Sequence, residues 1–220
     1  MFYVTSTTSS ITISSSTFTT SSCGKSGGGF YVQGTLTNTL SLTSTTFNTQ
    51  TAALNGGVFY YEGTGFTMTG TTITATNSIA TAGSGGIVYH LGTSSSITIQ
   101  TTSAFTNHKA GSGSGGAFYV VSTGGDNTLI LTSTTISTSE ASVAGGIFYF
   151  TGNIFTMTGS SITQTTSKAL SDHGGMFYVT STSSSITISS SVFTTVTAGK
   201  AGGGFYVKGT GANTLSLTSC

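Results

Sequence analysis

The amino-acid sequence predicts an all-β fold, a three-sided parallel β-helix (solenoid) of about eight coils. Three observations support this fold. A short phrase of glycines and aromatic residues recurs at a nearly constant interval, two further segments of strand character follow each recurrence, and no window has the 3.6-residue period of an amphipathic helix. We therefore interpret residues 1–220 as a single β-solenoid segment.

The recurring phrase sets the length of one coil. Its tyrosines are separated by 28 to 30 residues, a nearly fixed period of the kind that solenoid repeats show. Its first two glycines are expected where the chain turns onto a strand, because glycine adopts a positive φ at little cost and lets coils stack closely. After the opening MFYV, the phrase reads GGGFYV at 27–32, GGVFYY at 56–61, GGIVYH at 85–90, GGAFYV at 115–120, GGIFYF at 145–150, GGMFYV at 174–179 and GGGFYV at 202–207.

Two more strands are predicted in each coil. The second strand alternates apolar and hydroxyl residues, as in SITIS at 10–14 and TLSLT at 39–43. The third centres on one apolar residue between hydroxyl residues, as in TFT at 17–19. A period of two built from β-branched and aromatic residues is typical of a strand with one buried face. Three strands in each coil indicate a solenoid with three sides.

A three-coil pattern lies above the single-coil repeat. The second strands read SSSITI or TSSITI, then NTLSLTS or NTLILTS, then FTMTG, in the order ABCABCAB. Residues 1–44 closely match residues 176–219, so that Met1 aligns with the internal Met176. Natural solenoids carry caps over their open ends, and neither end of this sequence has the pattern of one. We therefore expect a window of a longer repetitive protein, without caps.

One tyrosine in each coil is predicted to point outward from the first strand. Strand alternation places the residues on either side of it, usually phenylalanine and valine, inside the solenoid. Such a ladder either stiffens the solenoid by stacking on itself or offers a strip for sugar stacking and lateral packing. The expected outer aromatic ladder consists of Tyr3, Tyr31, Tyr60, Tyr89, Tyr119, Tyr149, Tyr178 and Tyr206.

The second strands are predicted to carry outward columns of hydroxyl groups. Exposed strand positions favour threonine by propensity alone. Two further interpretations compete with that one: a flat, uncharged T-x-T array resembles the ice-binding face of β-solenoid antifreeze proteins, and dense Ser/Thr columns suit O-glycosylation. No asparagine lies in an N-x-S/T acceptor, so any glycan is expected to be O-linked. The column positions are Thr12, Ser41, Thr67, Thr98, Thr156, Thr187 and Ser216.

Residues that could carry chemistry are few. Only 4% of the chain is charged and its formal net charge is +1, which gives no basis for binding nucleic acid. No apolar run approaches the roughly 18 residues of a membrane span. Of the acids, only Glu140 and Asp172 share a loop position on adjacent coils, and we interpret both as solvated loop charges. His90 is expected at a core position and His108 and His173 in loops, without metal-site spacing. The sequence therefore predicts no enzyme activity, catalytic residue, metal or cofactor.

The two cysteines are not expected to form a disulfide with each other. About seven coils separate Cys23 from Cys220, which is roughly 34 Å at the spacing of paired strands. A disulfide requires Cα atoms within about 7 Å. Each cysteine is therefore predicted to be free or joined to a residue outside this sequence.

The coil pattern resembles the right-handed parallel β-helix proteins of pectin-lyase-like architecture. The GG-x-[FV]-Y phrase, best seen in GGAFYV at 115–120 and preceded by F-x-x-x-x-[AS], is also similar to repeats of the polymorphic outer-membrane protein and adhesin type. Those repeats pair GGA[IVL] with FxxN, which Phe47-Asn48-Thr49-Gln50 and Phe105-Thr106-Asn107-His108 only approximate, because the asparagine is misplaced. The resemblance is short but recurs in every coil, and it implies an extracellular adhesive or structural protein.

Together these features predict a non-enzymatic structural β-solenoid, extracellular or on the cell surface, that forms a rod, filament or surface coat. Its expected partners are further copies, through association along the axis or laterally, and glycans carried on the outer hydroxyl columns. The first alternative is an adhesin-type passenger domain that binds glycans. The second alternative is an ice-binding solenoid that uses its threonine array.

Overall fold

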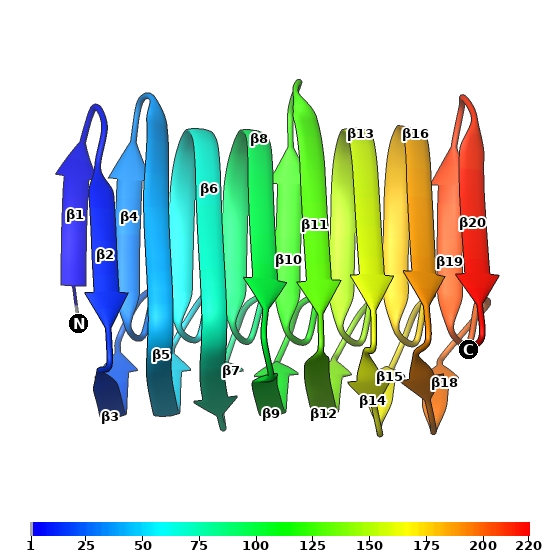
Figure 1. The fold of residues 1–220 in the computed structure, drawn as a ribbon, viewed down its shortest axis with the longest axis horizontal. Coiled ribbons are helices and arrows are strands. Elements are labelled where there is room, and N and C mark those ends of the chain that lie inside the picture. Colours follow the sequence, from blue (N-terminus) through cyan, green and yellow to red (C-terminus); the bar gives the residue numbers. More distant parts are fainter. Residues whose placement is uncertain (1) are drawn as a thin grey trace.

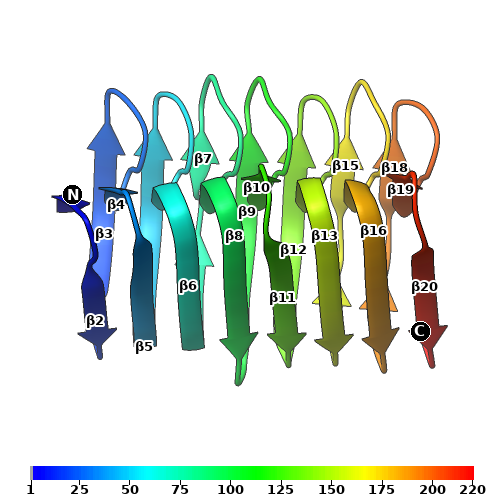
Figure 2. The same ribbon diagram turned by 90° about the horizontal axis from the view of Figure 1, so that it is seen from above.

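The computed structural model describes residues 2–220, which form stacked β-coils without any helix (Figures 1 and 2). All strand pairs are parallel, and they join the strands into one continuous sheet system. In chain order the strands are β1 (Phe2–Ser6), β2 (Ser10–Ser14), β3 (Thr17–Cys23), β4 (Phe30–Gly34), β5 (Thr37–Ala52), β6 (Phe59–Thr76), β7 (Ile79–Ala80), β8 (Val88–Gln100), β9 (Ser103–Ala110), β10 (Phe118–Ser122), β11 (Asp126–Thr132), β12 (Thr134–Ala141), β13 (Phe148–Ser160), β14 (Thr163–Gln164), β15 (Ser167–Ala169), β16 (Phe177–Ser189), β17 (Val192–Phe193), β18 (Val196–Ala198), β19 (Phe205–Gly209) and β20 (Asn213–Thr218).

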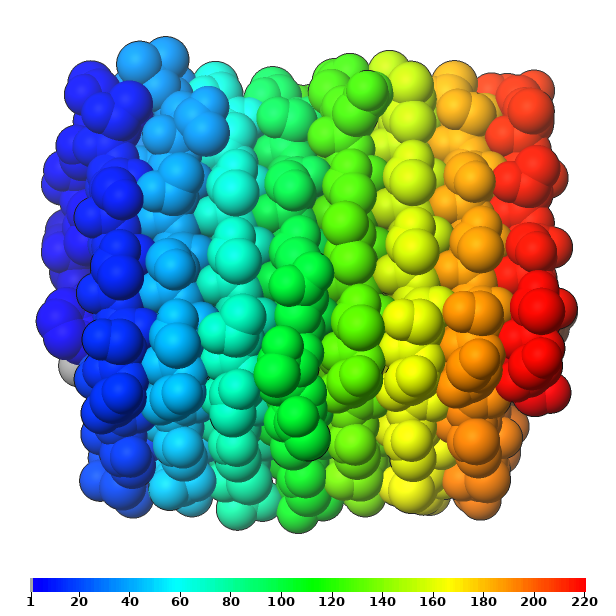
Figure 3. Space-filling model, in the orientation of Figure 1, coloured from blue at the N-terminus to red at the C-terminus, as the bar shows by residue number. Residues whose placement is uncertain are grey.

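Each coil pairs in register with the coils before and after it. The first strand of one coil, such as β4, lies between β1 and β6, so that Tyr31 faces Tyr3 on one side and Tyr60 on the other. The chain makes about seven such turns, and Figure 3 shows them as successive bands across the surface. The predicted all-β parallel solenoid with coils of about 29 residues is therefore confirmed.

The third strand is longer than the sequence pattern predicts. In β5 the chain continues past Phe47, bends at Thr49 and pairs again at Thr51 and Ala52. Thr49 has a φ of 52°, in the left-handed region that a β-branched residue seldom adopts. The extra segment adds a column of small inward residues, in which Cys23 lies opposite Ala52. Both Cys23 and Cys220 are free thiols.

Stacked aromatic rings fill the interior. Phe148 stacks on Phe118 with ring centroids 4.7 Å apart, and on Phe177 at 4.8 Å. From the third strands, Phe47 meets the ring of Phe59 edge-on at 5.2 Å. Offset-stacked and edge-to-face pairs are favourable arrangements for aromatic rings. The side chains shared between coils therefore hold the stack together in addition to its backbone hydrogen bonds.

Where a further coil follows, the glycine pair that opens the phrase is required at both of its positions. The first glycine has a φ between 63° and 71° in every coil, as the sequence predicts. The second packs against the next coil: a Cβ on Gly57 would overlap the carbonyl oxygen of Gly86 and lie 2.7 Å from the backbone nitrogen of Ile79. No side chain fits there unless the backbone moves.

The ABC order reflects different ways of filling the same interior. A B coil ends its second strand with the buried Leu42, whereas the next C coil has Gly70 in that register. A Cβ on Gly70 would overlap Cδ1 of Ile73, so the isoleucine at the following corner fills this space. Gly159 and Ile162 repeat the exchange in the second C coil. The three coil types are therefore alternative packing solutions for one cross-section.

Candidate functional site: the outer tyrosine and hydroxyl columns

The outward tyrosines of the first strands form one uninterrupted stack. Each ring lies 4.7 to 5.1 Å from the next, centroid to centroid, with interplanar angles of 1° to 15°. The flanking residues point inward, as at the buried Phe59 and Tyr61 on either side of Tyr60. The stack consists of Tyr3, Tyr31, Tyr60, Tyr89, Tyr119, Tyr149, Tyr178 and Tyr206.

This geometry decides what the tyrosine ladder can contact. Rings inside the ladder, such as Tyr89, have both faces covered by the tyrosines of adjacent coils. Sugar stacking requires an open ring face, so these members can offer only ring edges and hydroxyl groups. At one end Tyr3 is 64% exposed, and at the other Tyr206 contacts the imidazole of His173 with centroids 4.3 Å apart. The ladder therefore suits coil-to-coil stacking and edge contacts better than a sugar platform.

Phenol groups inside the ladder, such as those of Tyr60 and Tyr149, remain protonated well above neutral pH. Tyr60 donates a hydrogen bond to Oε2 of Glu62 at 3.0 Å. Burial, followed by that hydrogen bond and the carboxylate charge, raises the pKa of Tyr60 above its ordinary value of 10. Burial, with smaller effects from Tyr119 and Tyr178, raises the pKa of Tyr149 to about 12. At neutral pH these two phenol groups are therefore uncharged hydroxyl groups.

The outward hydroxyl groups form more than one column, and the predicted residues come from two of them. Thr12, Ser41 and Thr98 share one column with Thr187 and Ser216, but its member between Ser41 and Thr98 is Thr69. The predicted Thr67 and Thr156 instead belong to the neighbouring column. Outward positions recur every two residues along a strand, so alternation gives the correct face but cannot give the register between coils. In the fifth coil Ile130 replaces the hydroxyl residue beside Thr98.

Charged groups gather between the bend in the third strand and the glycine pair. Lys109 lies in β9 and Glu140 in β12, whereas Asp172 and Lys200 lie in the loop. Nζ of Lys109 lies 2.8 Å from Oε1 of Glu140, and Nζ of Lys200 lies 3.2 Å from Oδ1 of Asp172. His173 also contacts Asp172. The side chains of both acids are more than a quarter exposed, so each ion pair contributes little stability. The predicted shared loop position of the two acids is wrong, because Glu140 lies in β12 opposite Lys168 whereas Asp172 lies in a loop. Each acid is paired with a lysine of an adjacent coil, and not with the other acid.

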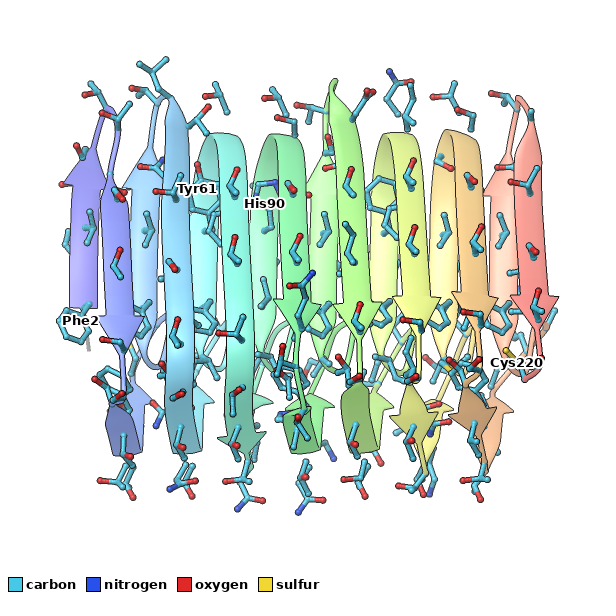
Figure 4. The ribbon with its side chains drawn as sticks, in the orientation of Figure 1. Phe2, Tyr61, His90 and Cys220 are labelled. Atoms are coloured by element: carbon cyan, nitrogen blue, oxygen red, sulfur yellow. The ribbon has the colours of Figure 1, made fainter. Side chains whose placement is uncertain are left out.

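Two histidines are buried inside the solenoid. His90 lies at the predicted core position, where it stacks on Tyr61 with centroids 5.1 Å apart (Figure 4). His108 was predicted in a loop but lies in β9 with 1% of its surface exposed. The prediction failed because the third strand was expected to end at its apolar residue, before the bend. Burial lowers the pKa of His90 to about 4 and that of His108 to about 3. Within residues 2–220 no group of three His, Cys, Asp or Glu side chains could hold a metal ion.

A shallow groove crosses the corner between the first and second strands. Its volume is about 780 Å³, and it extends over the first five coils. Gln33 and Glu62 lie at its polar side and bond each other at 3.4 Å, while Leu91 and threonines make up much of the rest. The sequence pattern did not reveal this groove, because its walls come mainly from strand residues at the corner after each first strand, and these residues have no common motif.

Models of protein families, curated proteins and solved structures provide no match to this chain. No helix in the described residues is long and apolar enough to cross a membrane. The class of protein that the structure defines is therefore a parallel β-solenoid with an outer tyrosine ladder and outer hydroxyl columns.

Proposed function

We propose that this chain is a non-enzymatic, extracellular structural β-solenoid that forms the shaft of a rod, filament or surface coat. One observation carries the proposal: the tyrosine stack keeps its register through every described coil, with each pair of rings within 5.1 Å. A continuous stack of rings beside continuous parallel strand ladders resists bending, because any bend must separate contacts on one side in several coils at once. A stiff shaft is what a rod or coat requires.

The outer columns provide the contacts of this shaft. Uncharged hydroxyl groups of serine and threonine face outward from the second strands, where they are open to lateral packing or to O-linked glycans. The aromatic interior is covered and takes no part in such contacts. A surface with few charges also places little electrostatic repulsion between neighbouring shafts.

An adhesin-type glycan-binding domain is the second candidate, and the groove beside Gln33 and Glu62 is the observation that favours it. Amide and carboxylate groups next to an apolar wall are able to orient a sugar by hydrogen bonds. Ice binding is the third candidate, and Ile130 weakens it because the isoleucine interrupts the hydroxyl array.

Electron microscopy of the native material, without recombinant truncation, tests the proposal. Long filaments should give a layer line at about 4.8 Å and a weaker one near 14 Å, the height of the three-coil pattern. Extra density along the serine and threonine columns would identify glycans directly. Short isolated rods attached to a membrane or to another domain would contradict the filament and favour the adhesin.

A further inference from the structure

A column of polar side chains runs along one inner edge of the solenoid. It lies just beyond the bend in the third strand and passes through five consecutive coils. The strand register brings its members together: His108 pairs with Ser139, and Ser139 pairs with Ser167. All members have 0% or 1% of their surface exposed. The polar column consists of Gln50, Ser78, His108, Ser139 and Ser167.

Among residues 2–220, the column has one paired polar atom, Nε2 of Gln50, which donates to the carbonyl oxygens of Phe18 and Asn48. The hydroxyl oxygens of its three serines, both ring nitrogens of His108 and Oε1 of Gln50 are all unpaired. Some buried polar groups elsewhere are paired, as where Ser95 donates to Oδ1 of Asn127 at 2.8 Å, and others, such as those of His90 and Gln164, are also unpaired. What distinguishes the column is that its unpaired groups follow one another in register through successive coils. Burying an unpaired polar group costs about 1–3 kcal/mol, so five adjacent coils with such groups indicate a ligand that satisfies them.

The coil spacing limits what this ligand can be. Residues in register on neighbouring coils lie about 4.8 Å apart, too far for a direct hydrogen bond between two hydroxyl groups, which requires about 2.5–3.0 Å. One water molecule can accept from one hydroxyl and donate to the next over that distance. Burial keeps the imidazole of His108 neutral, with one donor and one acceptor nitrogen. Backbone groups of Ala75 and Ser78 lie close to the ring and suit its donor nitrogen, so the acceptor nitrogen is the one left for a water molecule.

The serines have the smallest side chains of the column. The same inward position holds glutamine in the second coil, histidine in the fourth and Val196 in the seventh. Serine is smaller than any of these, and the coils keep the same register. From this difference in size we infer a space beside each serine, next to polar atoms, which is the kind of site that retains ordered water.

We propose that the polar column binds a file of ordered water molecules that bridge Ser78, His108, Ser139 and Ser167 from coil to coil. The file makes this edge of the interior a continuous hydrogen-bonded line, whereas the opposite edges are packed with aromatic and aliphatic side chains. The inference does not depend on the proposed shaft function, because it concerns the interior of a single solenoid.

A crystal structure of the full chain at about 1.2 Å tests the proposal. We expect one water peak between successive members of the column, each within about 2.6–3.2 Å of two column atoms. Serine hydroxyls bonded directly to backbone carbonyl groups, with no peaks between the coils, would overturn it. This result is independent of whether the protein assembles into filaments.

A substitution gives a second readout. Ser139→Val places in the fifth coil the residue that Val196 supplies in the seventh, so it fits the column. If water bridges the column, the valine removes two bridges and lowers the unfolding midpoint by several degrees. A raised midpoint would mean that valine fills a dry space, and it would refute the water file. Ser112→Val, at an exposed loop position, is the matched control and should leave the midpoint nearly unchanged. If Ser139→Val fails to fold, the crystal structure of the unaltered chain still decides.

Discussion

The hydroxyl oxygen of Ser103 accepts a hydrogen bond from the backbone N–H of Ile73, in the preceding coil, at 3.1 Å. The same hydroxyl group donates to the carbonyl oxygen of Gln100 at 2.9 Å. Ser191 binds the N–H of Ile162 in the same way at 3.1 Å. Both bonds join a C coil to the A coil that follows it, so serine at this corner stabilises the ABC order.

Ser103→Ala should lower the free energy of unfolding by about 1–3 kcal/mol, because it leaves the buried N–H of Ile73 without a partner. Chemical denaturation of the purified chain measures the change. Ser112→Ala, in the neighbouring exposed loop, is the control and should change the stability by less than about 0.5 kcal/mol. Equal effects of the two substitutions would contradict the role of this hydrogen bond.

Gly86→Ala should be more harmful than an ordinary glycine substitution. The added methyl group would overlap the carbonyl oxygen of Gly116 and lie 2.7 Å from the backbone nitrogen of Lys109. Separating the two coils should cost about 1–3 kcal/mol or more. Gly124→Ala is the matched control, since a Cβ there meets nothing within 4 Å. Thermal unfolding of the two variants should place Gly86→Ala clearly lower, and similar midpoints would contradict the close approach.

Stability should fall in alkali as the tyrosine ladder ionises. The folded-state pKa of Tyr149 is about 12, above its ordinary value of 10. A pKa raised by folding contributes stability that is fully present below pH 10 and is lost as the pH rises toward 12. Tyr149→Phe keeps the ring stack and removes the ionisable group, so its unfolding midpoint should decline less steeply over that interval. An unchanged slope would mean that the phenol is not perturbed by folding.

Stability should also fall in acid through the buried histidines. The folded-state pKa of His90 is about 4, below its ordinary value of 6.5. A lowered pKa contributes stability that is present above pH 6.5 and is lost as the pH falls toward 4. His90→Phe should flatten the dependence over this interval, because Phe150 already occupies the same inward column. Denaturation from pH 7 to pH 4 measures it, and equal slopes for the two proteins would contradict the prediction.

Much of the fold could be predicted because its signals are local. A glycine pair that turns the chain, a tyrosine every 28 to 30 residues and alternation within each strand are all visible without any contact information. The left-handed Thr49 has no such signal, since threonine rarely adopts this conformation and the stacked coils impose it. The strand segment beyond the bend was missed for that reason, and with it the burial of His108.

The sequence by itself determined the coil length, the three-coil pattern and the face on which each tyrosine and threonine lies. Only the tertiary structure decided which residues of successive coils stand side by side. In the tertiary structure Thr67 lies in a different column from Thr98, and adjacent tyrosine rings cover each other's faces. The register between coils also places the members of the buried polar column next to one another. The physical reason is that periodicity can be read along the sequence, whereas the register is set by contacts between residues of neighbouring coils. A loop that gains or loses one residue changes the spacing along the chain but leaves the stacked register intact.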